Sequence, residues 1–241
     1  MQLTGKTILL TGGTDGIGRE MALQLKAKGA TCILTGRNAD RCAAMSAQGF
    51  EVISADLSSQ AGVEAVVAGV AGRDIDILIN NAGAGSDHDF REGAPDLADN
   101  DRCIFLNLNA PIHLTTRLMD GLRARPEAMI VNVTSGLAIA PRSGGPIYCA
   151  TKAGLRSYTL ALRHQLRDTA IHVLEVLPPV VETKLTAGRG GQKKMPASEC
   201  AAQIVDAIET NADEANVGMT KLLRVVESIS PALARKIMIN Y

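Results

Sequence analysis

Residues 11–18 of the chain read TGGTDGIG. This glycine-rich stretch directly follows an aliphatic run, KTILL, and leads into a helix-length segment at 17–28 whose apolar residues recur at intervals of three and four. The pattern predicts a strand, a tight turn and a helix in succession. A turn with only a structural role is the alternative, and glycines alone do not exclude it.

Each glycine of this stretch has a distinct use in a nucleotide-binding turn. Gly12 permits the sharp turn, Gly16 lets the backbone approach a ligand, and Gly18 lets the helix pack closely on the sheet. A helix N-terminus at this point also offers free N–H groups and a positive dipole end to a diphosphate. We therefore expect a dinucleotide to contact these glycines and the residues between them, Thr14, Asp15 and Ile17.

Short aliphatic runs alternate with helix-length segments through the first part of the chain. Helices are expected at about 17–28, 38–48 and 59–72. Alternation of strand and helix is typical of βαβ units with right-handed crossovers. It predicts an α/β Rossmann fold, a doubly wound parallel sheet with helices on both faces. The expected strands read KTILLT, TCILTG, EVISAD, DILIN, AMIVNVTS and IHVLEVLP.

No linker rich in Pro, Gly or Ser divides the chain, so we expect a single domain over residues 1–241. A Gly- and Lys-rich segment, TAGRGGQKKMP, predicts a substrate-loop insertion at about 184–197. The segment EANVG predicts a short strand. The two stretches that follow, TKLLRVVESI and PALARKIMINY, predict a helical C-terminus at about 219–241.

The amino-acid composition indicates which partners and which cellular compartment to expect. The 25 basic residues balance 25 acidic ones, so we expect neither nucleic acid nor a membrane as a partner. Hydrophobic residues make up 46% and aromatic residues only 2%, which favours an aliphatic core of buried strands. The scattered cysteines and histidines predict no metal site. Without a basic, apolar leader, the expectation is a soluble cytoplasmic protein with free thiols.

The end of the second expected strand bears on the choice of dinucleotide. Sites that prefer NAD usually carry an acid about 20 residues after the glycines. This chain reads LTGRN there, with Gly36 and Arg37 in place of the acid. Because an arginine can bind a 2′-phosphate bidentately, NADP(H) is favoured over NAD(H). A solvated Arg37 at a helix start is the alternative, and Asp40 lies too far into the next helix to serve as the acid.

Several further motifs follow in order, and together they carry a resemblance to a known family. With TGGTDGIG, the chain is similar to the classical short-chain dehydrogenase/reductases over nearly its whole length. Its sequence most resembles a branch of small oxidoreductases named after the D-alanyl-lipoteichoic acid gene cluster. The resemblance implies an enzyme that moves hydride between a nicotinamide cofactor and a carbonyl or alcohol substrate. The motifs are NNAG at 80–83, FLNLNAP at 105–111, VTSGLAIAP at 133–141 and YCATK at 148–152.

Tyr148 and Lys152 are expected to carry the proton chemistry. A phenol ordinarily has a pKa of about 10, too high for easy proton exchange at neutral pH. A lysine four residues along a helix lies on the same face, and its charge favours the phenolate. The resemblance further implies that Ser135 orients the substrate oxygen. It also implies that Asn107 holds a water connecting Lys152 to solvent, and that Lys152 binds the cofactor ribose.

The resemblance implies additional cofactor contacts from four segments. In the loop after the sixth strand, the family's Pro-Gly reads Pro178-Pro179 here, which stiffens the turn and removes a donor. The expected contacts are Asp56 and Leu57 beside the adenine, Asn80, Ala82 and Gly83 through the backbone, Val180 at the nicotinamide, Thr183 at a phosphate, and Tyr148 and Lys152.

Other functions and assemblies remain open at this point. A non-catalytic NADP(H)-binding sensor would keep the fold, but it has no chemical need for the four catalytic side chains. An extended epimerase or dehydratase would need a longer chain and a different glycine spacing. The family's usual C-terminal tetramer segment is missing. A homodimer or homotetramer through the helices at about 96–122 and 147–167 is expected instead, and a monomer is the alternative. The apolar GLAIAP suggests a small or medium uncharged carbonyl compound as substrate.

Overall fold

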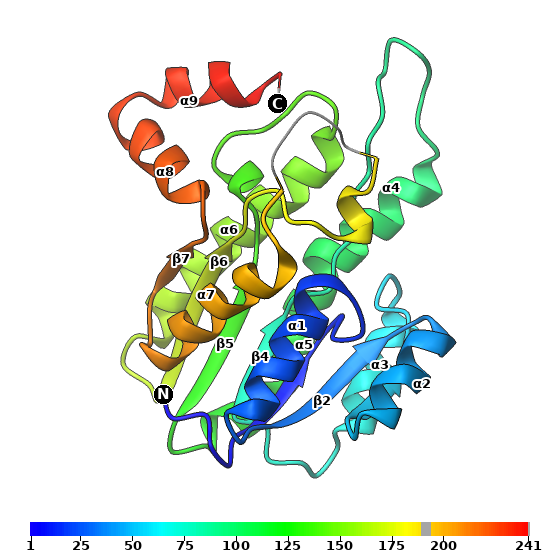
Figure 1. Ribbon diagram of the computed structural model, residues 1–241, viewed down its shortest axis with the longest axis vertical. Helices are drawn as coiled ribbons and strands as arrows, with labels where there is room; N and C mark the ends of the chain where they lie inside the picture. Colours follow the sequence, from blue (N-terminus) through cyan, green and yellow to red (C-terminus); the bar gives the residue numbers. More distant parts are fainter. Residues whose placement is uncertain (189–193, 241) are drawn as a thin grey trace.

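Seven parallel strands form one sheet in the order β3-β2-β1-β4-β5-β6-β7. The computed structural model describes residues 1–188 and 194–240. Strands are added outward on both sides of the β1–β4 pair, which confirms the predicted doubly wound α/β fold (Figure 1). The strands are β1 (Thr7–Leu10), β2 (Thr31–Gly36), β3 (Glu51–Ser54), β4 (Ile77–Asn80), β5 (Ala128–Val133), β6 (Ile171–Leu177) and β7 (Glu214–Asn216).

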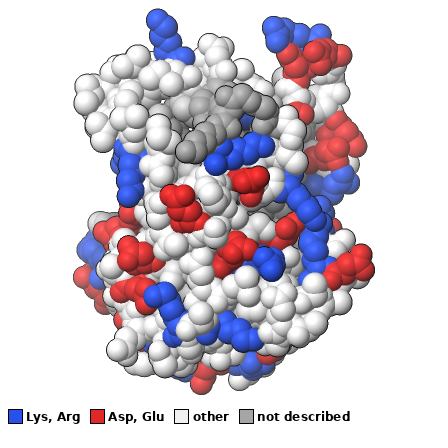
Figure 2. Space-filling model, viewed as in Figure 1, with Lys and Arg blue, Asp and Glu red and all other residues white. Residues whose placement is uncertain are grey.

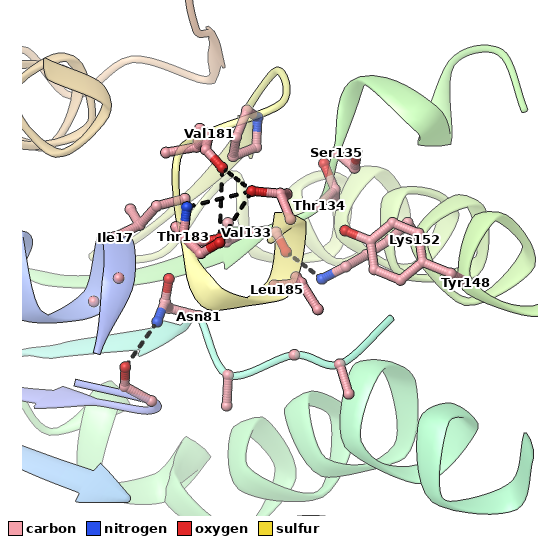
Figure 3. A pocket seen from close by; sticks show the side chains of 18 of the residues that line it. Ile17, Asn81, Val133, Thr134, Ser135, Tyr148, Lys152, Val181, Thr183 and Leu185 are labelled. Carbon is pink, nitrogen blue, oxygen red and sulfur yellow. Dashed lines mark hydrogen bonds between the residues drawn. The ribbon is translucent and has the colours of Figure 1, made fainter. Parts of the chain in front are cut away.

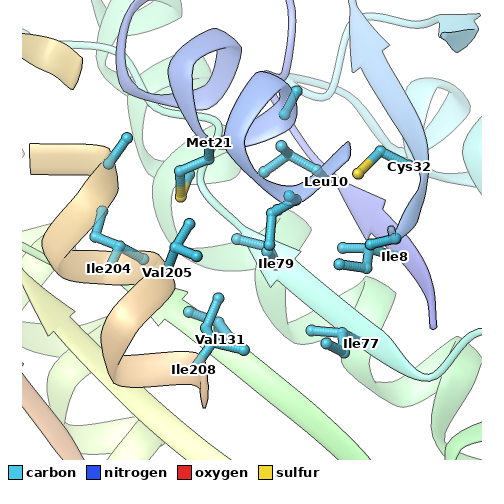
Figure 4. Close-up of a cluster of buried hydrophobic side chains, with 14 of the residues drawn as sticks. Ile8, Leu10, Met21, Cys32, Ile77, Ile79, Val131, Ile204, Val205 and Ile208 are labelled. Carbon is cyan, nitrogen blue, oxygen red and sulfur yellow. The ribbon is translucent and has the colours of Figure 1, made fainter. Parts of the chain in front are cut away.

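Helices cover both faces of the sheet because alternate strand residues point in opposite directions. Ile8 and Leu10 of β1 belong to one apolar cluster, whereas Leu9 between them belongs to the other. Figure 4 shows the first cluster, in which side chains of α1 and α7 meet those of the sheet. The first face carries α1 (Gly16–Ala27), α2 (Ala39–Ala47) and α7 (Ala197–Glu209), and the second carries α3 (Gln60–Gly69), α5 (Ala110–Arg123) and α6 (Pro146–Leu166).

Several helices begin at a polar side chain that accepts a hydrogen bond from a backbone N–H of the first turn. Such caps satisfy donors that have no partner inside the helix. Asp15 caps α1, Asn38 caps α2 and Ser59 caps α3. These caps fix where each helix starts, and they therefore fix the loops at the carboxyl ends of the strands.

The continuous helix predicted at about 96–122 is interrupted. It consists of α4 (Leu97–Ile104), a π-helical turn (Phe105–Asn109) and α5. The π-helical turn contains the buried Asn107. Such insertions occur frequently at functional sites because they redirect side chains within a helix.

The C-terminal segment has the elements that the sequence predicts. After β7 come α8 (Thr220–Ile229) and α9 (Pro231–Met238), which form a helical hairpin beyond one end of the sheet (Figure 1). The predicted substrate-loop insertion begins with a short 3₁₀ turn, Lys184–Thr186. Residues 189–193 of that insertion lie outside the described residues.

Charged side chains of both signs are spread over the face of the molecule in view in Figure 2. Basic and acidic side chains are interspersed there, without a broad patch of one sign (Figure 2). Within the described residues, no helix combines the length and the apolar character that a bilayer span needs.

Candidate active site

A cavity of about 920 Å³ lies at the carboxyl ends of the strands. Ligands of parallel α/β sheets bind at this edge, and small-molecule sites measure roughly 300–1,000 Å³. The cavity is lined by the β1–α1 turn, the ends of β2, β4 and β5, part of α6, the segment after β6, and α8 and α9. We call it the central cavity, and Figure 3 shows its middle part.

The glycine turn between β1 and α1 lines one side of the central cavity. Gly12 and Gly16 have φ angles of +65° and +52°, which residues other than glycine rarely adopt. A Cβ on Gly18 would lie 2.2 Å from the Gly12 carbonyl oxygen. Asp15 accepts from the Gly16 N–H at 2.9 Å. The backbone at these glycines therefore faces the cavity at a helix N-terminus, an arrangement that fits a dinucleotide diphosphate.

Asn80, the last residue of β4, and Asn81, which follows it, lie in different places. Asn80 is 2% exposed, and its Nδ2 donates to Asn132 Oδ1 at 2.8 Å inside the sheet. Asn81 lines the cavity, and its Nδ2 donates to the carbonyl oxygens of Thr11 and Gly12 at 2.9 and 3.3 Å. Asn81 thus holds the glycine turn, whereas Asn80, which we expected beside the cofactor, lies outside the cavity lining.

Tyr148 and Lys152 extend from α6 into the central cavity (Figure 3). The Lys152 Nζ donates to the Val133 carbonyl oxygen at 2.8 Å and lies 5.8 Å from the centroid of the Tyr148 ring. Burial lowers the pKa of Lys152 to about 8, so its ammonium is mostly charged at neutral pH. A fixed positive charge therefore stands beside the phenol.

Ser135 follows β5 and places a second hydroxyl at the central cavity. Its Oγ accepts from the Leu137 N–H at 3.1 Å, which begins a short 3₁₀ turn. Because β5 and α6 are packed together, the Ser135 and Tyr148 side chains reach the same cavity although they are thirteen residues apart.

Asn107 lies behind the cavity wall. Its Oδ1 accepts from the Ala84 N–H and its Nδ2 donates to the Ala84 carbonyl, both at 2.9 Å. A Cβ on Gly83 would lie 3.1 Å from Asn107 Oδ1 and 3.6 Å from Lys152 Nζ. Asn107 is thus a close neighbour of the Lys152 site across Gly83, and its role as a water ligand stays a prediction.

The end of β2 has no room for a side chain at position 36. A Cβ on Gly36 would lie 2.5 Å from Thr14 Oγ1 and 2.6 Å from Thr14 Cγ2. Thr14 is 8% exposed and is packed within the glycine turn. An acid at position 36 would therefore clash with the turn itself.

Basic and acidic side chains alternate at the rim of the cavity near β2. Arg37 pairs with Asp56 at 3.4 Å, and Arg41 pairs with Asp15 at 2.6 Å. Burial alone would raise the pKa of Asp56, but hydrogen bonds from Ser58 and the charge of Arg37 lower it below its usual value. Both arginines line the cavity and have exposed guanidinium groups that an anion could share.

The segment after β6 closes another side of the central cavity. Val180 and Thr183 line it, and the Thr183 Cγ2 would lie 3.1 Å from a Cβ on Gly16. Thr186 Oγ1 donates to the Val181 carbonyl at 2.5 Å and shapes this segment into a compact turn. The segment therefore contacts the glycine turn across the cavity.

Comparison with protein-family models identifies the chain. Residues 6–194 match the model for short chain dehydrogenases, and this span includes the glycine turn, Ser135, Tyr148 and Lys152. The chain belongs to the short-chain dehydrogenase family. Its carboxyl-terminal hairpin, α8 and α9, lies outside the matched span.

Individual relatives of this short-chain dehydrogenase agree with that assignment. The uncharacterized oxidoreductase DltE of Bacillus subtilis is 41% identical over 189 residues, which are 77% of this chain and 75% of the relative. A short-chain dehydrogenase from Sphingobium yanoikuyae, solved with NADPH, is 26% identical, with a TM-score of 0.83 and coverage of 95% and 94%. One from Burkholderia cenocepacia, solved with NADP, has a TM-score of 0.87 at 22% identity and 99% coverage of both chains, which shows the shared fold.

The central cavity brings together most side chains that the sequence pointed to in this short-chain dehydrogenase. The exceptions are Asn80 and Asn107. Asn81 and Arg41 were not expected there, although Arg41 follows Arg37 by only four residues and lies in the first turn of α2. The expected residues that line the cavity are Gly12, Thr14, Asp15, Gly16, Ile17, Gly18, Arg37, Asp56, Leu57, Ala82, Gly83, Ser135, Tyr148, Lys152, Val180 and Thr183.

Proposed function

We propose that this short-chain dehydrogenase transfers hydride between NADP(H) and a carbonyl or secondary-alcohol substrate, with Tyr148 as acid and base. One observation carries the proposal. The buried Lys152 ammonium, held by the Val133 carbonyl beside the Tyr148 ring, lines the same cavity as the glycine turn. A phenol beside a buried lysine and a dinucleotide-sized cradle therefore open into one space.

The chain's own residues would handle the proton and the charge on oxygen. A bound nicotinamide would supply the hydride in reduction and accept it in oxidation. Tyr148 donates its proton to the carbonyl oxygen in reduction and takes it back in oxidation. Lys152 stabilises negative charge on the phenol oxygen, and solvent then restores the proton. The Ser135 hydroxyl donates a hydrogen bond to the substrate oxygen as charge develops there.

Two features of the β2 end support NADP(H) as the preferred cofactor. Thr14 occupies the space that an acid at position 36 would need, so the usual partner of the NAD ribose cannot be placed there. Arg37 and Arg41 present guanidinium groups at the rim, where a 2′-phosphate could pair with them. The Sphingobium relative was solved with NADPH, which agrees with this preference.

Calorimetric titration with NADPH and NADH, followed by a panel of carbonyl compounds monitored at the nicotinamide absorbance, tests the proposal. We expect tighter binding of NADPH than of NADH, and NADPH oxidation with at least one uncharged ketone. Tight NADPH binding without turnover across the panel would instead favour a non-catalytic sensor. Failure to bind either dinucleotide would contradict the assignment of the glycine turn.

Replacement of Arg37 by Asp tests the cofactor preference separately. The substitution removes a charged hydrogen-bond donor and adds repulsion, so we expect NADPH binding to weaken by about tenfold to a hundredfold. NADH binding should change little. Arg73→Asp is the matched control, because Arg73 is an exposed arginine paired with Glu51 and does not line the cavity. An equal loss in both variants, or an unchanged NADPH preference, would remove Arg37 from the phosphate site.

A further inference from the structure

The α8–α9 hairpin is attached to the segment that connects Ser135 to Tyr148. At its beginning, a Cβ on Gly136 would lie 3.2 Å from Thr220 Oγ1 and 3.6 Å from Leu223 Cδ2. At its end, the Ser143 N–H donates to the Ile239 carbonyl at 2.9 Å. The hairpin is therefore held directly over the residues that are expected to bind the substrate oxygen.

A small apolar core fixes the orientation of the hairpin. Ala140, Ala234 and Met238 are buried together, and Leu137, Leu223 and Val226 pack against them. This cluster is separate from the two large clusters on the faces of the sheet. The hairpin thus has its own packing and forms a defined wall of the central cavity.

The wall that the hairpin contributes is apolar. Apart from Thr220, its cavity-lining side chains are those of Met219, Leu222, Leu223, Val226, Ile237 and Met238.

The charged residues that line the cavity lie elsewhere. Asp15, Arg37, Arg41 and Asp56 are at the dinucleotide rim, and Lys184 lies 3.8 Å from Asp15. Lys152 is the remaining charged lining residue among those described, and it belongs to the catalytic group. A substrate that extends from Ser135 and Tyr148 toward the hairpin therefore meets no charged partner among the described residues that line the cavity there.

We propose that the site selects an uncharged ketone or secondary alcohol whose aliphatic chain of several carbons lies under the α8–α9 hairpin. The inference rests on the proposed function. Burial of each methylene against aliphatic side chains stabilises the complex, whereas a buried carboxylate without a partner costs far more than the chain contributes. The hairpin lies outside the span that matches the family model.

A series of straight-chain 2-ketones, from 2-butanone to 2-decanone, tests the inference with NADPH. We expect kcat/KM to rise about threefold per added methylene until the cavity is filled. The anion 9-oxodecanoate, which carries a carboxylate in place of the terminal methyl group of 2-decanone, should be reduced at least about a hundredfold less efficiently than 2-decanone. A flat length profile, or equal use of the keto acid, would overturn the inference.

Two pairs of variants locate the effect on the cavity side of the hairpin. Leu222 and Ile237 line the cavity although they are 57% and 50% exposed, so Leu222→Asp and Ile237→Asp should still fold. Val225 and Leu233 are 53% and 49% exposed on the same two helices but do not line the cavity. Val225→Asp and Leu233→Asp are therefore matched controls.

The cavity-side variants should lower kcat/KM at least about tenfold more for 2-decanone than for 2-butanone, while the control variants change neither. Calorimetry with N-methyloctanamide, an unreactive amide of similar shape, should show the same loss of binding. Equal effects in both pairs would overturn the inference. No NADPH oxidation with any ketone, despite NADPH binding, would instead remove the proposed function and the inference with it.

Discussion

Replacement of Tyr148 by Phe is expected to lower kcat/KM for every substrate by about a thousandfold, within the range that a general acid contributes. The substitution removes the proton donor but keeps the ring beside Lys152, whose Nζ is held by the Val133 carbonyl. NADPH binding should therefore change by less than about threefold. Steady-state kinetics and calorimetric titration of the same preparation measure the two quantities.

Tyr158→Phe is the matched control for this substitution. Tyr158 lies on the same helix, packs against the apolar cluster on the second face of the sheet, and does not line the central cavity. Its loss of a hydroxyl should leave turnover within about twofold. A Tyr148→Phe enzyme that kept most of its rate, or a Tyr158→Phe enzyme that lost as much, would contradict the assignment of Tyr148 as the acid.

Features that depend on short-range sequence order could be predicted. The glycine turn follows β1 because both are contiguous in sequence, and the spacing of Tyr148 and Lys152 sets them on one face of α6. The order of strands and helices follows from the same local periodicities, since parallel strands require helical crossovers.

Features that depend on register or on distant packing could not be predicted. Whether Asn80 or Asn81 faces the cavity depends on which of the two pairs with Asn132 of β5, and the register between β4 and β5 sets that pairing. The π-helical turn at Asn107 shifts a helix that periodicity predicts as continuous. The apolar hairpin over the cavity has an amphipathic pattern, but nothing in that pattern states what its buried face covers.

A buried ion-pair network was also not predicted from the sequence, although an acidic residue within the apolar strand segment IHVLEVLP indicates one. Glu175 is 0% exposed in β6. It accepts from Arg156 at 2.5 Å and from the hydroxyl of Thr134, the neighbour of Ser135, at 2.8 Å. Arg156 also contacts Glu214 of β7, which pairs with Arg224 of α8. The network therefore connects the helix of Tyr148 to the C-terminal hairpin.

Replacement of Arg156 by Met is expected to lower the free energy of unfolding by about 3–5 kcal/mol at pH 8, because it leaves the Glu175 carboxylate buried without its cation. Chemical denaturation measures the loss. Arg117→Met is the matched control, since Arg117 pairs with Glu64 on the surface, where both side chains are about half exposed. That exposed pair should contribute no more than about 1 kcal/mol.

The pH dependence distinguishes an unpaired buried charge from a simple loss of packing. Burial raises the pKa of Glu175, and the charge of Arg156 with the hydrogen bonds from Thr134 and Arg156 only partly offsets this. Without Arg156 the pKa of Glu175 in the folded state rises further. At a pH above 4.5, the ordinary pKa of this carboxyl group, the unfolded chain therefore releases a proton that the folded protein keeps. The free energy of unfolding therefore falls as the pH rises through this window.

Arg156→Met should lose much less stability at pH 5 than at pH 8, and the added change Glu175→Gln should recover part of the loss at pH 8. Equal losses at both pH values would show that Arg156 acts through packing alone.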